Sequence, residues 1–322
     1  MASTAPAIPS ATGAPSRRRW LTWYRRYYLL VNLPVLLLVT ELLLVRFDLI
    51  HRWPFNEKDD LTKAFTSYAE RPPPASAKVL LLLGNSATDR GLDPQAIEAG
   101  LGDPGLRVYN FGLKGARLDD TLGLVDLARA RGVAPTAVVL GINTYLIDHK
   151  VAVDTLYPWL VRRTPYVYFH RSRIRTKLWR WVKSLVGLER RRLGKDSDDI
   201  PDGKTPESAI QTFLAEFDRR PADDFPMVEQ LPDVVAELTR RGLRVLVVLY
   251  PMAPSGTRRM AEYDALTAAI RAKAPADSLD LTHAPERFTD DMFYDVGHPN
   301  RAGRAAVTQA VIPWLRQELA PR

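Results

Sequence analysis

Four short apolar runs constrain the fold of this chain more than any other feature. They are rich in Leu and Val, and they occupy 78–83, 107–111, 137–140 and 243–250. A run that is apolar on both faces is typical of a strand buried in a parallel sheet. Amphipathic helical patterns lie between the runs, at 94–100, 119–131 and 228–241. This alternation predicts an α/β fold, a three-layer doubly wound parallel sheet, with functional residues at the carboxyl ends of its strands.

A longer apolar segment, 27–45, precedes this region. A helix of that length, at a rise of ~1.5 Å per residue, nearly spans the ~30 Å hydrocarbon core of a bilayer. Arginines crowd its N-terminal side, whereas mixed charges follow it. The positive-inside rule therefore predicts a single-pass protein of the inner membrane, with a cytoplasmic N-terminus and a periplasmic remainder. No small-residue cleavage site follows, which favours an uncleaved anchor. A buried core helix is the alternative, because Asn32, Pro34 and Glu41 interrupt the segment.

Composition sets the remaining boundaries. Residues 1–26 read as a disordered cytoplasmic tail that ends in basic residues, and 46–76 as a connector that closes on three prolines. The globular domain is then 77–322. Within it, 150–226 breaks the alternation with many Arg and Lys residues interleaved with aromatic ones. Such a segment is typical of a helix at a membrane interface. The alternative is an ordinary insertion that packs on the surface of the domain.

The charge balance and the missing cysteines limit the function classes. The net charge of +8 favours anionic partners such as a membrane surface or an acidic polymer. Nucleic acid is not expected as a partner of an exported domain. The chain has no cysteine, which excludes disulfides, thiolate zinc sites and a cysteine nucleophile. Nothing in the sequence indicates a metal or an organic cofactor.

Candidate site residues follow the predicted strands. Ser86 comes directly after the first strand and a glycine, where its hydroxyl could act as a nucleophile and its amide could bind an oxyanion. A helix N-cap is the alternative role for this serine. Gly115 could bring a backbone amide close to a substrate oxygen, with Gly112 as its rival. Asn143 follows the third strand and could donate from its side-chain amide.

The base candidate is His298. A neutral imidazole can accept a serine proton and return it later, and Asp295, three residues earlier, could orient the ring. His149 and His283 are weaker rivals. A zinc site built on Asp295 and His298 would need further ligands, and the sequence offers no such cluster.

Together these segments resemble the SGNH (GDSL-like) hydrolase superfamily, over roughly 77–317. The first block is Gly84-Asn85-Ser86, and Gly115 aligns with the oxyanion glycine of the second. The third block is Gly141-Ile142-Asn143-Thr144. The last is Asp295 to His298, continued by a Pro-Asn-x-x-Gly stretch before a C-terminal helix. The resemblance implies Ser86, Asp295 and His298 as a catalytic triad. Asn85 and Thr144 depart from it, because the family has aspartate at both positions.

The predicted anchor narrows the resemblance to accessory proteins of polysaccharide O-acetylation, which work with membrane-bound O-acyltransferases. By that resemblance, Ser86 would carry an acyl group, most often acetyl, to or from an extracytoplasmic glycan. The expected partners are the membrane, an acylated glycan or acyl donor, and an O-acyltransferase. Two alternatives stay open: a lipase-like esterase on membrane lipids, and a non-catalytic subunit that binds glycan or acts as a scaffold. The residues do not decide between hydrolysis and transfer.

Overall fold

The computed structural model describes residues 60–143, 200, 202–217, 226–260, 263–282, 284 and 286–320. They belong to a compact unit that joins 54–156 to 189–322. A second unit comprises 1–53 and 157–188, and only scattered helical positions between 27 and 43 are described in it. Across these described residues, we find no helix that is both long and apolar enough to cross a bilayer. The predicted anchor 27–45 is described only in part, and most of the insertion 150–226 lies outside the described residues.

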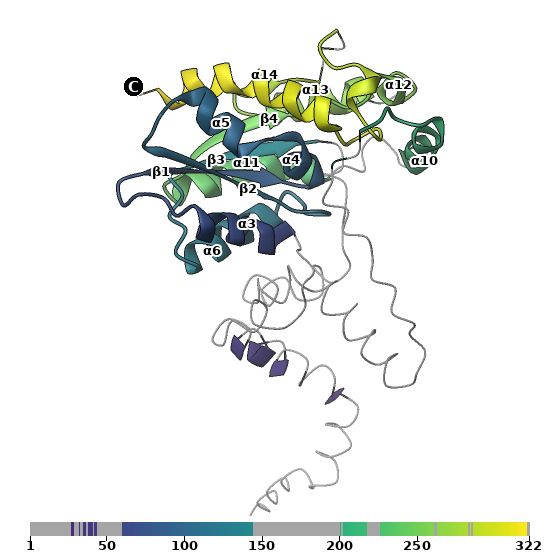
Figure 1. The fold of residues 1–322 in the computed structure, drawn as a ribbon. Coiled ribbons are helices and arrows are strands. Elements are labelled where there is room, and N and C mark those ends of the chain that lie inside the picture. The colour runs from purple at the N-terminus through teal and green to yellow at the C-terminus, as the bar shows by residue number, and fades with distance from the viewer. Residues whose placement is uncertain are drawn as a thin grey trace, which may run out of the picture. The chain divides into compact units, whose positions relative to one another are not determined.

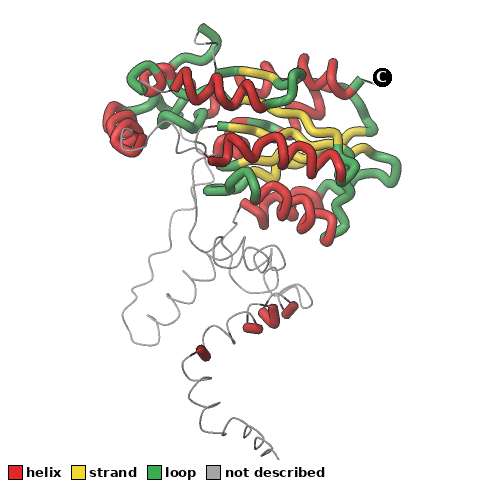
Figure 2. The backbone as a smooth tube through the Cα atoms, turned by 180° about the vertical axis from the view of Figure 1, so that it is seen from behind, coloured by secondary structure: helices red, strands yellow, loops and turns green. Residues whose placement is uncertain are grey.

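A parallel five-stranded sheet forms the centre of the larger unit (Figures 1 and 2). The strands are β1 (Lys78–Gly84), β2 (Leu106–Gly112), β3 (Ala137–Ile142), β4 (Arg244–Leu249) and β5 (Leu279–Asp280). Their order in the sheet is β2-β1-β3-β4-β5, and every pair is parallel. This is a doubly wound order with a switch point between β1 and β3. The predicted α/β class and the four strands read from the apolar runs are confirmed.

One face of the sheet is covered by α5 (Pro94–Leu101) and α14 (Arg301–Leu319). Leu80 and Leu82 of β1 point to this side and join one buried cluster with Ile97 of α5 and Val311 of α14. Side chains alternate along a strand, so the intervening residues of β1 point to the opposite face. All of them are buried, as expected for a strand between two helical layers.

The opposite face is covered by α3 (Asp60–Glu70), α6 (Asp120–Ala130), α11 (Pro226–Arg240) and α13 (Tyr263–Lys273). The α3 helix lies within 46–76, which the sequence suggests to be a connector. Here Phe65 meets Phe111 of β2 edge to face, with ring centroids 5.2 Å apart, and Tyr68 meets Tyr109 in the same way. Residues 60–70 are thus part of the packed unit, because their aromatic side chains cover the outer part of the sheet.

The other described helices belong to the same unit. They are α4 (Ser86–Gly91), α10 (Glu207–Phe217), α12 (Pro254–Thr257) and the single 3₁₀ turn η1 (Asp290–Met292). The α4 helix begins at the carboxyl end of β1, and the chain that follows η1 leads into α14. Register pairs Gly84 with Gly112 and Leu83 with Leu140, so the strands β2, β1 and β3 end side by side. Their following loops therefore share one edge of the sheet.

Candidate active site

The turn that presents Ser86 depends on a glycine and an asparagine. Gly84 has φ +146°, and a Cβ there would collide with Thr88 of α4 and with the carbonyl oxygen of Gly141. Asn85 then caps α4, because its Oδ1 accepts a hydrogen bond from the amide of Ala87 at 2.9 Å. Ser86 is the first residue of the helix and is not its cap. The N-cap role that the sequence offered as an alternative for Ser86 therefore belongs to Asn85.

Ser86, His298 and Asp295 lie in one hydrogen-bonded chain. The Oγ of Ser86 is 2.6 Å from Nε2 of His298, although the two residues are 212 positions apart. On the other side of the ring, Nδ1 lies 2.9 Å from each carboxylate oxygen of Asp295. The carboxylate also accepts the backbone amides of Gly297 and His298, each at 2.9 Å. A carboxylate on Nδ1 places a proton there and leaves Nε2 to accept the serine proton.

The loop that carries Asp295 and His298 is fixed at both ends. The Tyr294 amide donates to the carbonyl oxygen of His298, and Phe293 and Pro299 form an antiparallel bridge. Asn300 caps α14 through the amide of Gly303, at 3.0 Å. It also donates to the carbonyl oxygens of Gly203 and Asp291, at 2.8 and 2.6 Å. The Pro-Asn-x-x-Gly stretch singled out in the sequence is therefore the clamp that holds this loop onto α14.

Gly115, the leading backbone candidate for an oxyanion donor, lies on the exposed turn that follows β2. It has φ +68°, and a Cβ there would meet no atom within 4 Å. Its rival Gly112 is buried, and a Cβ on it would collide with the backbone of α4 at Asp89. The Gly112 amide already donates to Oδ1 of Asn110, at 2.9 Å. The structure therefore favours Gly115 over Gly112 as a residue whose amide can meet a ligand.

Asn143 lies at the carboxyl end of β3, across the switch point from Ser86. Its side chain is 4% exposed. Its Oδ1 accepts a hydrogen bond from Nδ2 of Asn85 at 2.7 Å, which links it to the residue next to the nucleophile. Thr144, which follows it, lies outside the described residues. The structure thus brings Ser86, Asn143, Asp295 and His298 to one edge of the sheet.

Two residues that sequence reasoning missed lie beside the imidazole. The ring of Tyr294 stacks on His298, with centroids 5.6 Å apart and planes 14° from parallel. The guanidinium of Arg90 lies 5.1 Å from the centre of the Tyr294 ring and donates to its hydroxyl. Burial raises the pKa of the Tyr294 hydroxyl, so it stays neutral at physiological pH. The only sequence signal was the position of Tyr294 next to Asp295.

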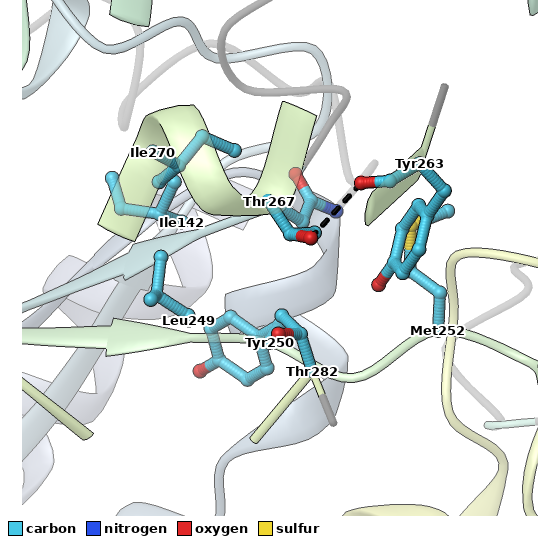
Figure 3. Close-up of a pocket in the computed structure, with 9 residues that line it drawn as sticks. Ile142, Leu249, Tyr250, Met252, Tyr263, Thr267, Ile270 and Thr282 are labelled. Atoms are coloured by element: carbon cyan, nitrogen blue, oxygen red, sulfur yellow. Dashed lines mark hydrogen bonds between the residues drawn. The ribbon is translucent and has the colours of Figure 1, made fainter. Parts of the chain in front are cut away.

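A pocket adjoins the site on the side of β4 and α13 (Figure 3). Its lining includes the apolar side chains of Ile142, Leu249, Met252 and Ile270. Asn143 also lines the pocket and is the residue that belongs both to the pocket and to the candidate active site. On the α13 wall of the pocket, the Thr267 hydroxyl donates to the carbonyl oxygen of Tyr263, one helical turn earlier, at 2.9 Å.

The described residues contain no group of three or more His, Asp or Glu side chains that could hold a metal ion. The rival bases His149 and His283 lie outside the described residues. Within the described part, the imidazole of His298 is the one that meets a serine hydroxyl on one side and a carboxylate on the other. Such an arrangement can perform serine-based acyl transfer.

Comparisons with known proteins find similarity among solved structures alone. No family model matches the chain, and no curated protein matches it. Among solved structures, TesA is 16% identical and covers 74% of this chain and 99% of its own, with a TM-score of 0.38. A candidate acylhydrolase from Bacteroides fragilis is 14% identical and covers 82% and 100%, with a TM-score of 0.40. A candidate GDSL-like lipase from Parabacteroides merdae is 12% identical and covers 77% and 100%, with a TM-score of 0.36.

The site geometry therefore carries the functional argument. The segments that resemble SGNH blocks follow β1, β2 and β3 and precede α14, in the order in which the resemblance places them. The chain thus has a doubly wound α/β fold, and the segments that resemble SGNH (GDSL-like) blocks lie at the ends of its strands and before its last helix.

Proposed function

We propose that the protein is a serine acylesterase or O-acyltransferase that works through an acyl-Ser86 intermediate. The observation that carries this proposal is the continuous hydrogen-bonded chain from Ser86 through His298 to Asp295. A structural serine needs no imidazole at 2.6 Å, and an imidazole that only fills space needs no carboxylate on its other nitrogen. The combination is the one that nucleophilic catalysis requires.

In the proposed reaction, Oγ of Ser86 attacks the carbonyl carbon of an ester while its proton passes to Nε2 of His298. Asp295 holds the ring and stabilises its charged form. The amides of Ser86 and Gly115 and the Asn143 side chain bind the negative oxygen of the tetrahedral intermediate. Collapse breaks the ester bond, and the departing alcohol takes the proton from His298. Water or another hydroxyl then attacks the acyl-serine in the same way and releases the acyl group.

The substrate that we propose is an acyl ester, in the first place acetyl, of an extracytoplasmic glycan. The support comes from the apolar segment 27–45 and its arginine-rich flank, which predict an anchored, exported domain. In such a reaction a glycan ester donates the acyl group to Ser86, and a glycan hydroxyl or water accepts it. A membrane-bound O-acyltransferase is the proposed partner that would supply the acyl donor.

A second candidate function is a lipase-like esterase on membrane lipids. The basic insertion 150–226, with its interleaved aromatic residues, has the composition of a segment that lies on an anionic bilayer. The two functions differ in the acyl chain that they favour. A glycan acetyl enzyme should prefer acetyl esters, whereas a lipase should prefer esters of long chains.

The test is turnover of acetyl, butyryl and dodecanoyl esters of one chromogenic alcohol by the full chain in detergent micelles. An oligosaccharide acceptor is then added, and mass spectrometry measures free acetate against acetylated sugar. Ser86→Ala should abolish turnover, whereas Ser208→Ala, at an exposed serine of α10, should not change it. The proposal is wrong if the folded wild-type protein turns over no ester, or if Ser86→Ala keeps full activity. Lack of turnover would favour a non-catalytic subunit.

A further inference from the structure

The segment 202–205 contacts both ends of the loop that carries the proposed base. At one end, the Thr205 hydroxyl donates to the carbonyl oxygen of Phe293 at 3.2 Å, although the two residues are 88 positions apart. At the other end, the carbonyl oxygen of Gly203 accepts from Nδ2 of Asn300 at 2.8 Å. The two contacts lie two residues before the aspartate of the proposed triad and two residues after its histidine.

The backbone of this loop explains why Phe293 needs a donor from outside. Phe293 and Pro299 form an antiparallel bridge, and backbone hydrogen bonds join the residues on either side of the bridge rather than the two residues themselves. In such a pair, the carbonyl group of each residue points away from the partner strand. Phe293 is fully buried, and a buried carbonyl without a donor is costly. The hydroxyl of Thr205, itself a buried residue, supplies that donor.

The loop can set only one of the two contacts of its histidine by itself. The carboxylate of Asp295 accepts two backbone amides of the loop and contacts Nδ1 of His298, all within four residues. The contact between His298 and Ser86 is different, because it joins the loop to α4 across 212 positions of sequence. Its length depends on where the whole loop lies. Contacts from outside the loop must therefore fix that distance.

We propose that Thr205 is a positioning residue, whose hydrogen bond to Phe293 holds the loop where Nε2 of His298 meets Oγ of Ser86. This inference rests on the proposed function. It also gives a residue of the range 150–226, which the sequence marks as an insertion, a part in the reaction. A displacement of ~1 Å caused by a change far from the reacting atoms can cost about 10²-fold in rate. Thr205 is one of several supports of the loop, so we expect the loss of its hydroxyl to cost about tenfold.

Thr205→Val tests the proposal, because valine has nearly the shape of threonine and lacks the hydroxyl. The measured quantities are kcat and KM for acetyl ester hydrolysis by the full chain in detergent micelles. The variant should lower kcat by about tenfold with little change in KM, since no group that contacts the substrate is altered. Its pH–rate profile should keep its shape, because the pairing of Asp295 with His298 lies within the loop. A folded Thr205→Val with kcat within about twofold of the wild type would overturn the proposal.

A second pair of variants guards against poor packing of the valine. Thr205→Ser keeps the hydroxyl and should retain most of kcat, whereas the slightly smaller Thr205→Ala should lose as much as Thr205→Val. Thr212→Val is the matched control, because the Thr212 hydroxyl donates to the carbonyl oxygen of Ser208 at 2.8 Å on the exposed side of α10. It should leave kcat unchanged. Equal kcat in Thr205→Ser and Thr205→Ala, or an equal loss in Thr212→Val, would count against the positioning role.

Hydrogen–deuterium exchange of the peptide 293–300 separates this inference from the proposed function, because it reports local opening without any substrate. The amides of this peptide should exchange faster in Thr205→Val than in the wild type, and at the wild-type rate in Thr212→Val. Unchanged exchange in Thr205→Val would refute the inference even in an active enzyme. A wild type that turns over no ester, but whose loop exchanges faster in Thr205→Val, would refute only the proposed function.

Discussion

The clamp at Asn300 gives a stability prediction whose magnitude follows from three hydrogen bonds. Asn300 caps α14 through Gly303, which is typically worth about 1 kcal/mol of stability. Its Nδ2 also donates to the carbonyl oxygens of Gly203 and Asp291, and each such bond contributes about 1 kcal/mol net. Asn300→Ala should therefore lower the free energy of unfolding by about 3 kcal/mol. That is a large share of a typical total of about 5–15 kcal/mol.

Urea unfolding followed by circular dichroism measures this change. Asn300→Ser keeps an oxygen for the cap and loses the two donations, so it should be destabilised by about 2 kcal/mol. Asp93→Ala is the control, because Asp93 caps α5 through the amides of Gln95 and Ala96 at a half-buried position, with Arg304 3.6 Å from its carboxylate. It should lose only about 1 kcal/mol. If Asn300→Ala were no more destabilising than Asp93→Ala, the clamp would not have the role that we assign to it.

Three further predictions concern the core and the base. Gly141→Ala places a methyl group against the ring of Tyr250, so it should lower stability by about 1–3 kcal/mol and visibly reduce Tm; an unchanged Tm would contradict the close packing. Tyr294→Ala removes the ring stacked on His298, worth about 0.5–1.5 kcal/mol, and should lower kcat/KM by up to about tenfold, whereas Tyr294→Phe should retain activity. Burial raises the pKa of the Tyr250 hydroxyl, so the folded state holds that proton more tightly than the unfolded chain. Stability should fall as the pH rises above about 10, by up to about 1.4 kcal/mol per pH unit for this group. Tyr250→Phe should flatten that slope in urea titrations between pH 8 and 11, and an unchanged slope would argue against the burial of its hydroxyl.

The sequence was sufficient for the centre of the fold because buried strands leave a strong signal. The strands β1 to β4 each correspond to an apolar run, and α5, α6 and α11 to the helical patterns between the runs. The strand β5 left no such signal, since it has two half-buried residues, Leu279 and Asp280. The α3 helix was missed because its polar start resembles a linker, and its aromatic residues become informative only when β2 is placed beside them.

The site was predictable in its residues and less so in its contacts. The glycines and the order of segments marked Ser86, Asn143, Asp295 and His298, and the sheet brings these four residues to one edge. The contact between Asn85 and Asn143 could not be foreseen, because it joins loops 58 positions apart and depends on which end of each amide faces the other. The stacking of Tyr294 on His298 likewise depends on the path of a loop that no local pattern specifies.

An activated Ser86 nucleophile should react with a serine-directed fluorophosphonate, whereas an ordinary surface serine should not. The full chain, Ser86→Ala and Ser208→Ala are each exposed to the reagent in detergent micelles, and their intact masses are measured. We expect one adduct on the wild type and on Ser208→Ala, and none on Ser86→Ala. A folded wild type that gains no adduct, or a Ser86→Ala variant that still gains one, would contradict it.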